Sequence, residues 1–377
     1  MKVIVIGGNA AGMSAAAKLH RLQQESEITV YEKGPYLSYA PCGLPYFLAN
    51  PEIKKESLIQ RTKEQFEAIG IQPILRHEVL SVFPDMKKVA VKNLETGQVF
   101  EDSFDKLMIA SGAQALIPPF PGINLEGVHT LKTIDDGAIL KEKLSDENIK
   151  EIAIIGGGYI GVEVAEALSA SDKHIRIIEM ADRLLMPFDP EISDYAFEEM
   201  NKLGVEVNLK EKLVSIEGSQ RVASIVTDQG TYKADLVLMA IGVKPATGFL
   251  KDSGIQLAKN SAVVTDKELR TNIPDIYAAG DCAEVYHLVK QHNAYIALAT
   301  TANKCGRIAG ENLAGGHYTF AGTLGSSALK IGGIELARTG LSENEAKDLN
   351  LNYKTVMVKT AAIPHYYPGG TPIHLKI

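Results

Sequence analysis

Several features that would place this 377-residue chain in other protein classes are missing from it. No run of 18 or more apolar residues occurs, so no segment is predicted to span a membrane. The apolar stretch before Gly7 is too short for a signal peptide and no cleavage site follows it, so we expect a cytoplasmic protein. The net charge of −7 leaves no basic surplus to neutralise phosphates, which argues against nucleic acid as the partner.

Cysteine is scarce and histidine is scattered. Three cysteines, Cys42, Cys282 and Cys305, are too few for a disulfide framework in a cytosolic chain. The nine histidines lack the spacing of a metal site, so no metal is expected. Tryptophan is absent, which excludes nothing. The chain is 45% hydrophobic and 23% charged, and this ordinary globular composition rules out a disordered or fibrous protein.

The N-terminal residues show the pattern of a dinucleotide-binding βαβ unit. Residues 2–6 form a continuous apolar run, as in a strand buried on both faces of a parallel sheet, and an Ala-rich helix follows the turn Gly7-Gly8-Asn9-Ala10-Ala11-Gly12. The next strand, residues 28–31, ends in Glu32, 20 residues after Gly12, where a carboxylate would meet a ribose hydroxyl. Asn9 replaces the middle glycine of the fingerprint, and we expect the turn to form because Asn tolerates unusual backbone angles.

A second unit of the same kind begins at residues 152–155. The segment Gly156-Gly157-Gly158-Tyr159-Ile160-Gly161 matches the complete fingerprint and precedes a helix. The strand at residues 175–178 then ends in Glu179. Two such units in one chain favour two bound dinucleotides over two turns without a ligand.

Each unit is followed by a further strand of similar sequence, which indicates an internal duplication. Residues 105–112 resemble residues 235–242, and each segment reads as a buried strand that ends in a small residue and Gly. A third such strand ends in Asp281, so the chain is expected to return to the first domain there. The predicted fold is α/β, with two Rossmann-like dinucleotide-binding domains, one inserted in the other, and an α+β C-terminal domain.

The predicted domains follow from these repeats. Residues 1–112 and 244–319 form the first dinucleotide domain, and residues 113–243 form the second. The pattern changes at about residue 320, and residues 320–377 form the third domain. This segment has fewer than 60 residues and stops in the strand pattern of residues 373–377, which is a poor basis for an independent core. We therefore expect the third domain to be incomplete or to be completed by a partner.

Cys42 lies between Pro41 and Gly43, at a turn that is expected to lead into a helix. A helix N-terminus lowers the pKa of a thiol and makes the thiolate available as a nucleophile. The alternative for a lone cysteine is a small buried apolar residue, which we expect for Cys282 and Cys305. The neighbouring dinucleotide site favours the redox role for Cys42.

Taken together, these motifs resemble the pyridine nucleotide–disulfide oxidoreductases. The resemblance is carried by the two glycine fingerprints, by Ser38-Tyr39-Ala40-Pro41-Cys42-Gly43-Leu44-Pro45-Tyr46 and by Ala278-Ala279-Gly280-Asp281-Cys282-Ala283. Within the family, the sequence resembles the single-cysteine branch of coenzyme A-disulfide reductases, NADH oxidases and peroxidases, and persulfide reductases. The resemblance implies FAD in the first domain, NAD(P)H in the second and a homodimer formed through the third.

The resemblance also implies roles for individual residues. FAD contacts are expected from Gly7, Gly8, Ala11, Gly12, Glu32, Lys33, Val79, Ser111, Gly112, Asp281, Ala299 and Thr300. Nicotinamide nucleotide contacts are expected from Gly158, Ile160, Gly161, Glu179 and Gly242. Contacts with the coenzyme A substrate are expected from Ser14, Lys18, Arg21, Ser38, Pro41 and Tyr367, with Cys42 as the redox residue. Because a carboxylate repels a 2′-phosphate, Glu179 predicts a preference for NADH over NADPH, which Arg183 nearby would soften.

The sulfur chemistry depends on the fact that Cys42 has no partner cysteine. Leu37 and Phe47 occupy the positions of a C-x-x-x-x-C pair, so Cys42 must cycle as a mixed disulfide with a small thiol or as a sulfenic acid. Family oxidases and peroxidases carry His where this chain has Ala10, which favours disulfide or persulfide reduction. The leading hypothesis is FAD-dependent, NAD(P)H-driven reduction of coenzyme A disulfide or a related persulfide. The alternatives are an NADH oxidase that reduces oxygen through a Cys42 sulfenic acid and a non-catalytic redox-sensing flavoprotein.

Overall fold

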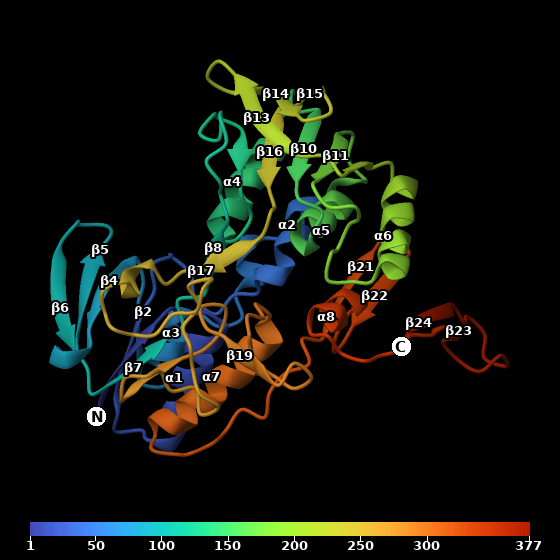
Figure 1. The fold of residues 1–377 in the computed structure, drawn as a ribbon. Coiled ribbons are helices and arrows are strands. Elements are labelled where there is room, and N and C mark those ends of the chain that lie inside the picture. The colour runs from blue at the N-terminus through green and yellow to red at the C-terminus, as the bar shows by residue number, and fades with distance from the viewer.

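Two five-stranded parallel sheets form the framework of the computed structural model, which describes all of residues 1–377 (Figure 1). The first sheet runs in the order β18 (Ile276–Ala278), β7 (Lys106–Ile109), β1 (Lys2–Ile6), β2 (Glu27–Tyr31) and β3 (Ile71–Ile74). The second runs in the order β12 (Glu206–Leu209), β11 (His174–Glu179), β10 (Glu151–Ile155), β16 (Leu236–Met239) and β9 (Val128–His129). The predicted α/β class with two Rossmann-like units is confirmed.

Strand β1 shows why a continuous apolar run forms a strand in this fold. Val3 and Val5 pack into one hydrophobic cluster, and Ile4 and Ile6 pack into another on the opposite face of the sheet. The covering layers are helices α1 (Ala10–Leu22) and α7 (Ala299–Leu313) on the first face and antiparallel strands β4 (His77–Phe83), β5 (Lys88–Asn93) and β6 (Val99–Ser103) on the second. Both faces are therefore buried.

The second sheet repeats this arrangement. Ile152 and Ile154 of β10 face a helical layer, whereas Ala153 and Ile155 face an antiparallel sheet. The layers are α4 (Ile134–Leu144), α5 (Tyr159–Leu168) and α6 (Pro190–Lys202) on one face and β13 (Leu213–Gly218), β14 (Val222–Thr227) and β15 (Thr231–Lys233) on the other. The internal duplication that the sequence indicated thus extends to the layers around each sheet.

The chain passes between the two sheets through a pair of short strands. These strands, β8 (Ala113–Ala115) and β17 (Val243–Pro245), pair in antiparallel fashion. The domain boundaries at residues 112 and 243 stay a prediction. The remaining short elements before residue 320 are α2 (Leu44–Ala49), α3 (Lys63–Glu67), β19 (Val285–His287) and β20 (His292–Ala294). None of the helices combines the length and apolar character needed to cross a membrane.

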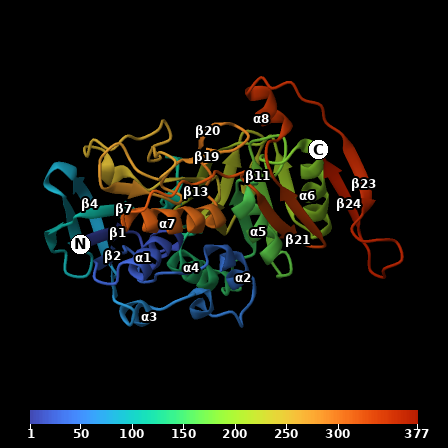
Figure 2. The ribbon, with the colours of Figure 1, turned by 90° about the horizontal axis from the view of Figure 1, so that it is seen from below.

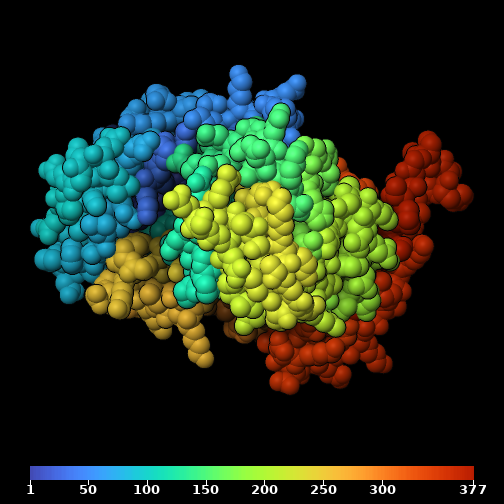
Figure 3. All heavy atoms as spheres, turned by 90° about the horizontal axis from the view of Figure 1, so that it is seen from above, coloured from blue at the N-terminus to red at the C-terminus, as the bar shows by residue number.

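The C-terminal region consists of two hairpins and a short helix. Its elements are β21 (Ser327–Ile331), β22 (Ile334–Arg338), α8 (Glu343–Asp348), β23 (Met357–Ala361) and β24 (Pro372–Lys376). Leu329, Ile331 and Leu336 of the first hairpin join the hydrophobic core of the second sheet. The second hairpin stands out from one end of the molecule, and every residue of β23 is exposed (Figures 2 and 3). Lys376 anchors this hairpin through ion pairs with Glu191 and Glu343.

Glu345 on α8 connects the C-terminal region to earlier parts of the chain. Its Oε1 lies 2.9 Å from Lys290 Nζ, and its Oε2 accepts hydrogen bonds from Arg338 Nη2 at 2.6 Å and from the Ser342 N–H at 2.9 Å. Burial raises the pKa of Glu345, but the hydrogen bonds from Lys290, Ser342 and Arg338 outweigh burial and lower the pKa to about 2. The folded protein therefore favours the ionised carboxylate.

This low pKa predicts that Glu345 stabilises the fold above acidic pH. Because the folded pKa lies below the unfolded value of about 4.3, the stabilisation is complete above pH ~4.3 and is lost as the pH falls towards 2. In urea unfolding, Glu345→Gln should reduce the free energy of unfolding by about 2 kcal/mol at pH 7, less than the full pKa difference implies because solvent screens this partly exposed carboxylate, and by little at pH ~2. The control is Glu335→Gln, which makes the same charge change at an exposed residue of β22. Equal losses in the two variants would contradict the prediction.

Candidate active site

The first glycine turn joins β1 to α1. Gly7 has a φ of +105°, and a Cβ there would lie 2.2 Å from the Ala110 carbonyl oxygen, so only glycine fits. A Cβ at Gly12 would lie 1.9 Å from the Gly7 carbonyl oxygen. Helix α1 has no acidic residue in its first turn, and its N-cap residue, Asn9, makes no capping hydrogen bond through its side chain. The N–H groups at this end are therefore available to a phosphate.

The second glycine turn, between β10 and α5, has the same geometry. Gly156 has a φ of +110°, and its Cβ would lie 2.5 Å from the Ala240 carbonyl oxygen. A Cβ at Gly161 would lie 2.0 Å from the Gly156 carbonyl oxygen. Helix α5 also begins without a side-chain cap and without an acidic residue in its first turn. The two turns therefore offer equivalent anion-binding helix ends.

The middle position of the fingerprint differs between the turns for a reason that the sequence did not indicate. Asn9 has a φ of −111°, and Gly158 has a φ of −77°. No atom lies within 4 Å of a Cβ built at Gly158. The expectation that Asn9 is tolerated because it adopts unusual backbone angles is therefore wrong. The position has an ordinary φ and open space, so a side chain fits there.

Glu32 and Glu179 occupy matching positions at the ends of β2 and β11. Glu32 accepts hydrogen bonds from the N–H groups of Gly8 at 2.6 Å and Gly34 at 2.7 Å. Glu179 accepts hydrogen bonds from the N–H groups of Gly157 at 2.6 Å and Ala181 at 2.7 Å. Burial raises the pKa of Glu32, and the two N–H groups partly offset this effect. Each carboxylate is thus fixed beside its glycine turn, where a ribose diol would approach.

Ser111 and Gly112 follow β7 and lie beside the first glycine turn. The Ser111 hydroxyl oxygen is buried and has no hydrogen-bond partner, which marks a polar group in position for a ligand. Gly112 has a φ of +69°, and Gly242 has a φ of +121° at the equivalent place in the second unit; no atom lies within 4 Å of a Cβ built at either. Asp281, after β18, lies 3.4 Å from Lys132 Nζ, so its carboxylate is paired.

The other residues predicted to contact the two dinucleotides are spread over α1, β4, α5, α7 and the loop after β2. Ala11 is buried in the first turn of α1, Val79 is buried on β4, Lys33 pairs with Glu78 at 2.7 Å, Ala299 and Thr300 begin α7, and Ile160 lies in the first turn of α5. These residues belong to the expected units, but no contact places Val79, Ala299 or Thr300 directly at a glycine turn. Their contacts with a dinucleotide stay a prediction.

Cys42 lies in a single 3-10 turn, Pro41–Gly43, that leads directly into α2. Cys42 is exposed, whereas Cys282 and Cys305 are fully buried. Burial of Cys282 and Cys305 raises their pKa values to about 11 and about 12. Cys42 is thus the one thiol that a substrate can reach.

The pKa of the Cys42 thiol is raised, not lowered as the sequence suggested. The protein around the exposed residue still removes water from the sulfur, and this desolvation is the largest cause. Glu163 and Asp281 raise the pKa further, and Lys132 lowers it. Helix α2 has only six residues, so its N-terminus does not outweigh burial. The thiol is therefore mainly protonated at neutral pH, and Lys132 is the nearby charge that favours the thiolate.

The structure brings two of the predicted substrate residues to the junction of α1 and α7. The Ser14 hydroxyl donates a hydrogen bond to Asn303 Oδ1 at 2.9 Å, and Lys18 Nζ lies 3.1 Å from Glu311. Arg21 is exposed at the end of the same helix. Asn303 was not predicted, because α1 and α7 are far apart in the sequence and only their packing brings Asn303 beside Ser14.

Ser38 is hydrogen-bonded to the first glycine turn and Pro41 lies directly before Cys42, whereas Tyr367 lies in the C-terminal region. The Ser38 N–H donates to the Gly8 carbonyl oxygen at 2.8 Å, and Pro41 begins the 3-10 turn that contains Cys42. Tyr367 is exposed in the loop of the β23–β24 hairpin, at the projecting end of the molecule (Figure 2). Within one chain, therefore, Tyr367 is not part of the Cys42 site. No group of three or more His, Cys, Asp or Glu residues is placed to hold a metal ion.

Comparisons with known proteins agree with this geometry. Residues 1–306 match the family described as pyridine nucleotide-disulphide oxidoreductase. The NAD(P)H coenzyme A polysulfide/persulfide reductase of Pyrococcus horikoshii is 37% identical over 376 residues, a match that covers 100% of this chain and 83% of that protein. The two dinucleotide-binding units, each built on a parallel sheet, together with this match define the class of the protein as an FAD-dependent NAD(P)H oxidoreductase. The chain belongs to the pyridine nucleotide-disulphide oxidoreductase family.

Solved structures place the chain near both reductases and oxidases. The reduced CoADR-RHD of Bacillus anthracis matches with a TM-score of 0.96 at 32% identity, covering 100% of this chain and 68% of that one. The water-forming NADH oxidase of Lactobacillus brevis, bound to NADH, matches with a TM-score of 0.95 at 33% identity, covering 100% and 83%. The substrate therefore has to be argued from the site.

The residues of the first unit fit FAD, the cofactor of this family. The uncapped N-terminus of α1 suits a pyrophosphate, Glu32 suits a ribose diol, and the unpartnered Ser111 hydroxyl offers a further polar contact. When bound, FAD takes a hydride from NAD(P)H and makes its electrons available to sulfur. The second unit, with Glu179 and its own uncapped helix, suits the nicotinamide nucleotide in the same way.

Proposed function

We propose that the protein uses NAD(P)H to reduce coenzyme A disulfide or a related coenzyme A persulfide, with Cys42 as the redox residue. The observation that carries this proposal is that Cys42 is exposed, four residues after the Ser38 N–H that hydrogen-bonds to the first glycine turn, while the two other cysteines are buried. A similar Pyrococcus protein carries the name of a coenzyme A polysulfide/persulfide reductase, which supports the choice of substrate.

A single thiol requires a mixed disulfide with the substrate. The Cys42 thiol first loses its proton, a step that Lys132 favours and Glu163 opposes. The thiolate attacks one sulfur of coenzyme A disulfide, a bond forms between the two sulfurs, and the other coenzyme A leaves as a thiolate that takes up a proton. Two electrons and a proton, supplied by oxidation of NAD(P)H, then split the mixed disulfide into a coenzyme A thiol and the Cys42 thiolate.

The junction of α1 and α7 is the proposed binding surface for the coenzyme A chain. Ser14 and Asn303 offer a hydroxyl and an amide, and Arg21 is exposed to meet a phosphate. Lys18 is paired with Glu311, which offsets its positive charge. We therefore expect Arg21, rather than Lys18, to contact a phosphate group of coenzyme A.

We also propose that the active enzyme is a homodimer, as the family resemblance implies. The projecting hairpin exposes apolar side chains, among them Val356, Met357 and Leu375, and Tyr367 lies at its tip. A contiguous exposed apolar segment of this kind is typical of an interface. A second copy of the chain would cover the hairpin, and Tyr367 of one copy would then lie close to Cys42 of the other.

NADH oxidase activity is the second candidate function, because the Lactobacillus brevis oxidase has almost the same fold. Ala10 argues against it. This residue begins α1 beside the first glycine turn and offers no proton or hydrogen bond to a reduced oxygen species. The two candidates differ in whether NADH is consumed without oxygen.

Anaerobic turnover distinguishes these candidates. The purified holoprotein should oxidise NADH when coenzyme A disulfide is added under argon, and should release two coenzyme A thiols for each NADH, because both halves of the disulfide are reduced. Thiol release can be followed with a chromogenic disulfide in quenched samples. NADH loss that requires air and releases no thiol would instead indicate the oxidase. Absence of both activities would contradict the proposal.

A further inference from the structure

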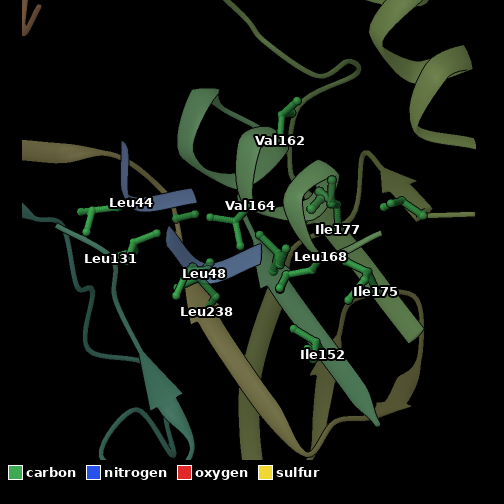
Figure 4. Packing of buried hydrophobic residues seen from close by; sticks show 14 of the residues in the cluster. Leu44, Leu48, Leu131, Ile152, Val162, Val164, Leu168, Ile175, Ile177 and Leu238 are labelled. Carbon is green, nitrogen blue, oxygen red and sulfur yellow. The ribbon is translucent and has the colours of Figure 1, made fainter. Parts of the chain in front are cut away.

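Helix α2, which follows Cys42, is built into the core of the second unit. Leu44 and Leu48 pack in one cluster with Val162 and Val164 of α5 (Figure 4). The sequence position of α2 placed it in the first dinucleotide domain, but its apolar side chains are buried against the second. The position of Cys42 therefore depends on how α2 is held there.

Lys141, on α4, holds the far end of α2. Its Nζ donates hydrogen bonds to the carbonyl oxygens of Asn50 at 2.8 Å and Ile53 at 2.9 Å, just after the last turn of the helix. The same ammonium lies 4.2 Å from the centre of the Phe47 ring. Burial lowers the pKa of Lys141. A cation here meets the negative end of a helix and an aromatic face together, and one side chain thereby fixes three parts of the α2 segment.

The opposite end of the α2 segment is held by the first unit. The Ser38 N–H donates to the Gly8 carbonyl oxygen at 2.8 Å, and the Gln60 N–H donates to the Ser38 carbonyl oxygen at 2.8 Å. Cys42 thus lies between one attachment to the first glycine turn and one attachment to α4. A shift at either end moves the thiol relative to both dinucleotide units.

We propose that Lys141 is a positioning residue for Cys42: by fixing the C-terminal end of α2, it sets where the thiol lies relative to the first glycine turn and to Glu163 of α5. This role rests on the proposed redox function of Cys42. Lys141 takes no part in the chemistry itself. It acts through the helix, whose first turn directly follows the cysteine.

Lys173 provides a matched control for a purely structural effect. Its Nζ also donates to two backbone carbonyl oxygens, those of Asp146 at 3.3 Å and Ile149 at 2.8 Å, after the end of α4 in the same unit. Lys141→Met and Lys173→Met therefore remove the same kind of interaction. Only the first removes an interaction from the helix that follows Cys42.

The test compares the two variants as holoproteins in steady-state kinetics and in alkylation of Cys42. For Lys141→Met, kcat with coenzyme A disulfide should fall about tenfold with kcat/KM for NADH unchanged, because a displaced thiol slows the sulfur step and not the reaction with NADH. Iodoacetamide should modify Cys42 about threefold faster at pH 7, and the pH midpoint of the modification should be lower. We expect this because the displaced thiol is less buried and farther from Glu163, and both burial and Glu163 raise its pKa. Lys173→Met should leave both measurements unchanged, and Lys141→Arg should restore both, since a guanidinium also donates to carbonyls and lies over aromatic rings.

The alkylation measurement keeps this proposal separate from the proposed function. It reports the position of Cys42 even if the substrate is not a coenzyme A disulfide, and Cys42→Ser gives the background rate. Equal changes in Lys141→Met and Lys173→Met, or no change in either, would overturn the positioning role. If Lys141→Met does not fold, Lys141→Gln retains one amide donor and should show the same changes at smaller size. Wild-type kinetics in that variant would also overturn the proposal.

Discussion

Cys42→Ser should abolish NADH-driven reduction of coenzyme A disulfide, with kcat lower by about a thousandfold or more. A serine hydroxyl cannot form a disulfide with the substrate, so the reaction loses its covalent step. Neither of the other cysteines can replace Cys42. Cys282 and Cys305 are fully buried, and burial raises the pKa of each thiol.

Reduction of an artificial acceptor separates loss of the thiol from loss of the cofactor. Ferricyanide takes electrons without a thiol intermediate, so Cys42→Ser should still oxidise NADH with ferricyanide at near wild-type rates and should retain its FAD absorbance. Cys305→Ser also replaces a sulfur atom by an oxygen atom, but at a buried position on α7, and this variant should keep the disulfide reductase activity. Disulfide reduction by Cys42→Ser at a tenth of the wild-type rate or more would show that the sulfur step does not use Cys42.

The fold was predictable because the same short-range pattern occurs twice. In β1 and β10 the apolar run is continuous, since alternate side chains such as Val3 and Ile4 enter different cores on the two faces of the sheet. Gly7 and Gly156 are required locally, because any Cβ would meet backbone atoms of the neighbouring strand end. Periodicity and glycine spacing capture such requirements directly.

Other features of the site depend on contacts between distant segments and were not predictable. Nothing in residues 44–49 indicates that α2 packs against α5 of the second unit, or that Lys141 would lie over Phe47. Asn303 reaches Ser14 only because α7 packs along α1. The raised pKa of Cys42 has the same origin, since desolvation and the charge of Glu163 come from elements that the local Pro-Cys-Gly pattern does not contain.

The remaining large effect concerns the choice between NADH and NADPH. Glu179 is held at the end of β11 by the N–H groups of Gly157 and Ala181, so its charge is fixed beside the second glycine turn. A 2′-phosphate that approaches this carboxylate meets a like charge in a partly buried site, which costs several kcal/mol. Glu179→Ser removes the charge and keeps a short polar group there. The ratio of kcat/KM for NADPH to that for NADH should therefore rise about a hundredfold.

Glu32 supplies the matched control, because it has the same hydrogen-bond geometry in the other unit. Glu32→Ser should lower the FAD content of the purified protein without changing the coenzyme ratio of the fraction that retains FAD. Glu179→Ser should do the reverse, keeping full FAD content while its coenzyme preference changes. The two substitutions thus separate the two dinucleotide sites. A coenzyme ratio that Glu179→Ser leaves unchanged would mean that the carboxylate does not face the adenosine ribose, and Arg183, four residues further along the chain, would then be the next residue to replace.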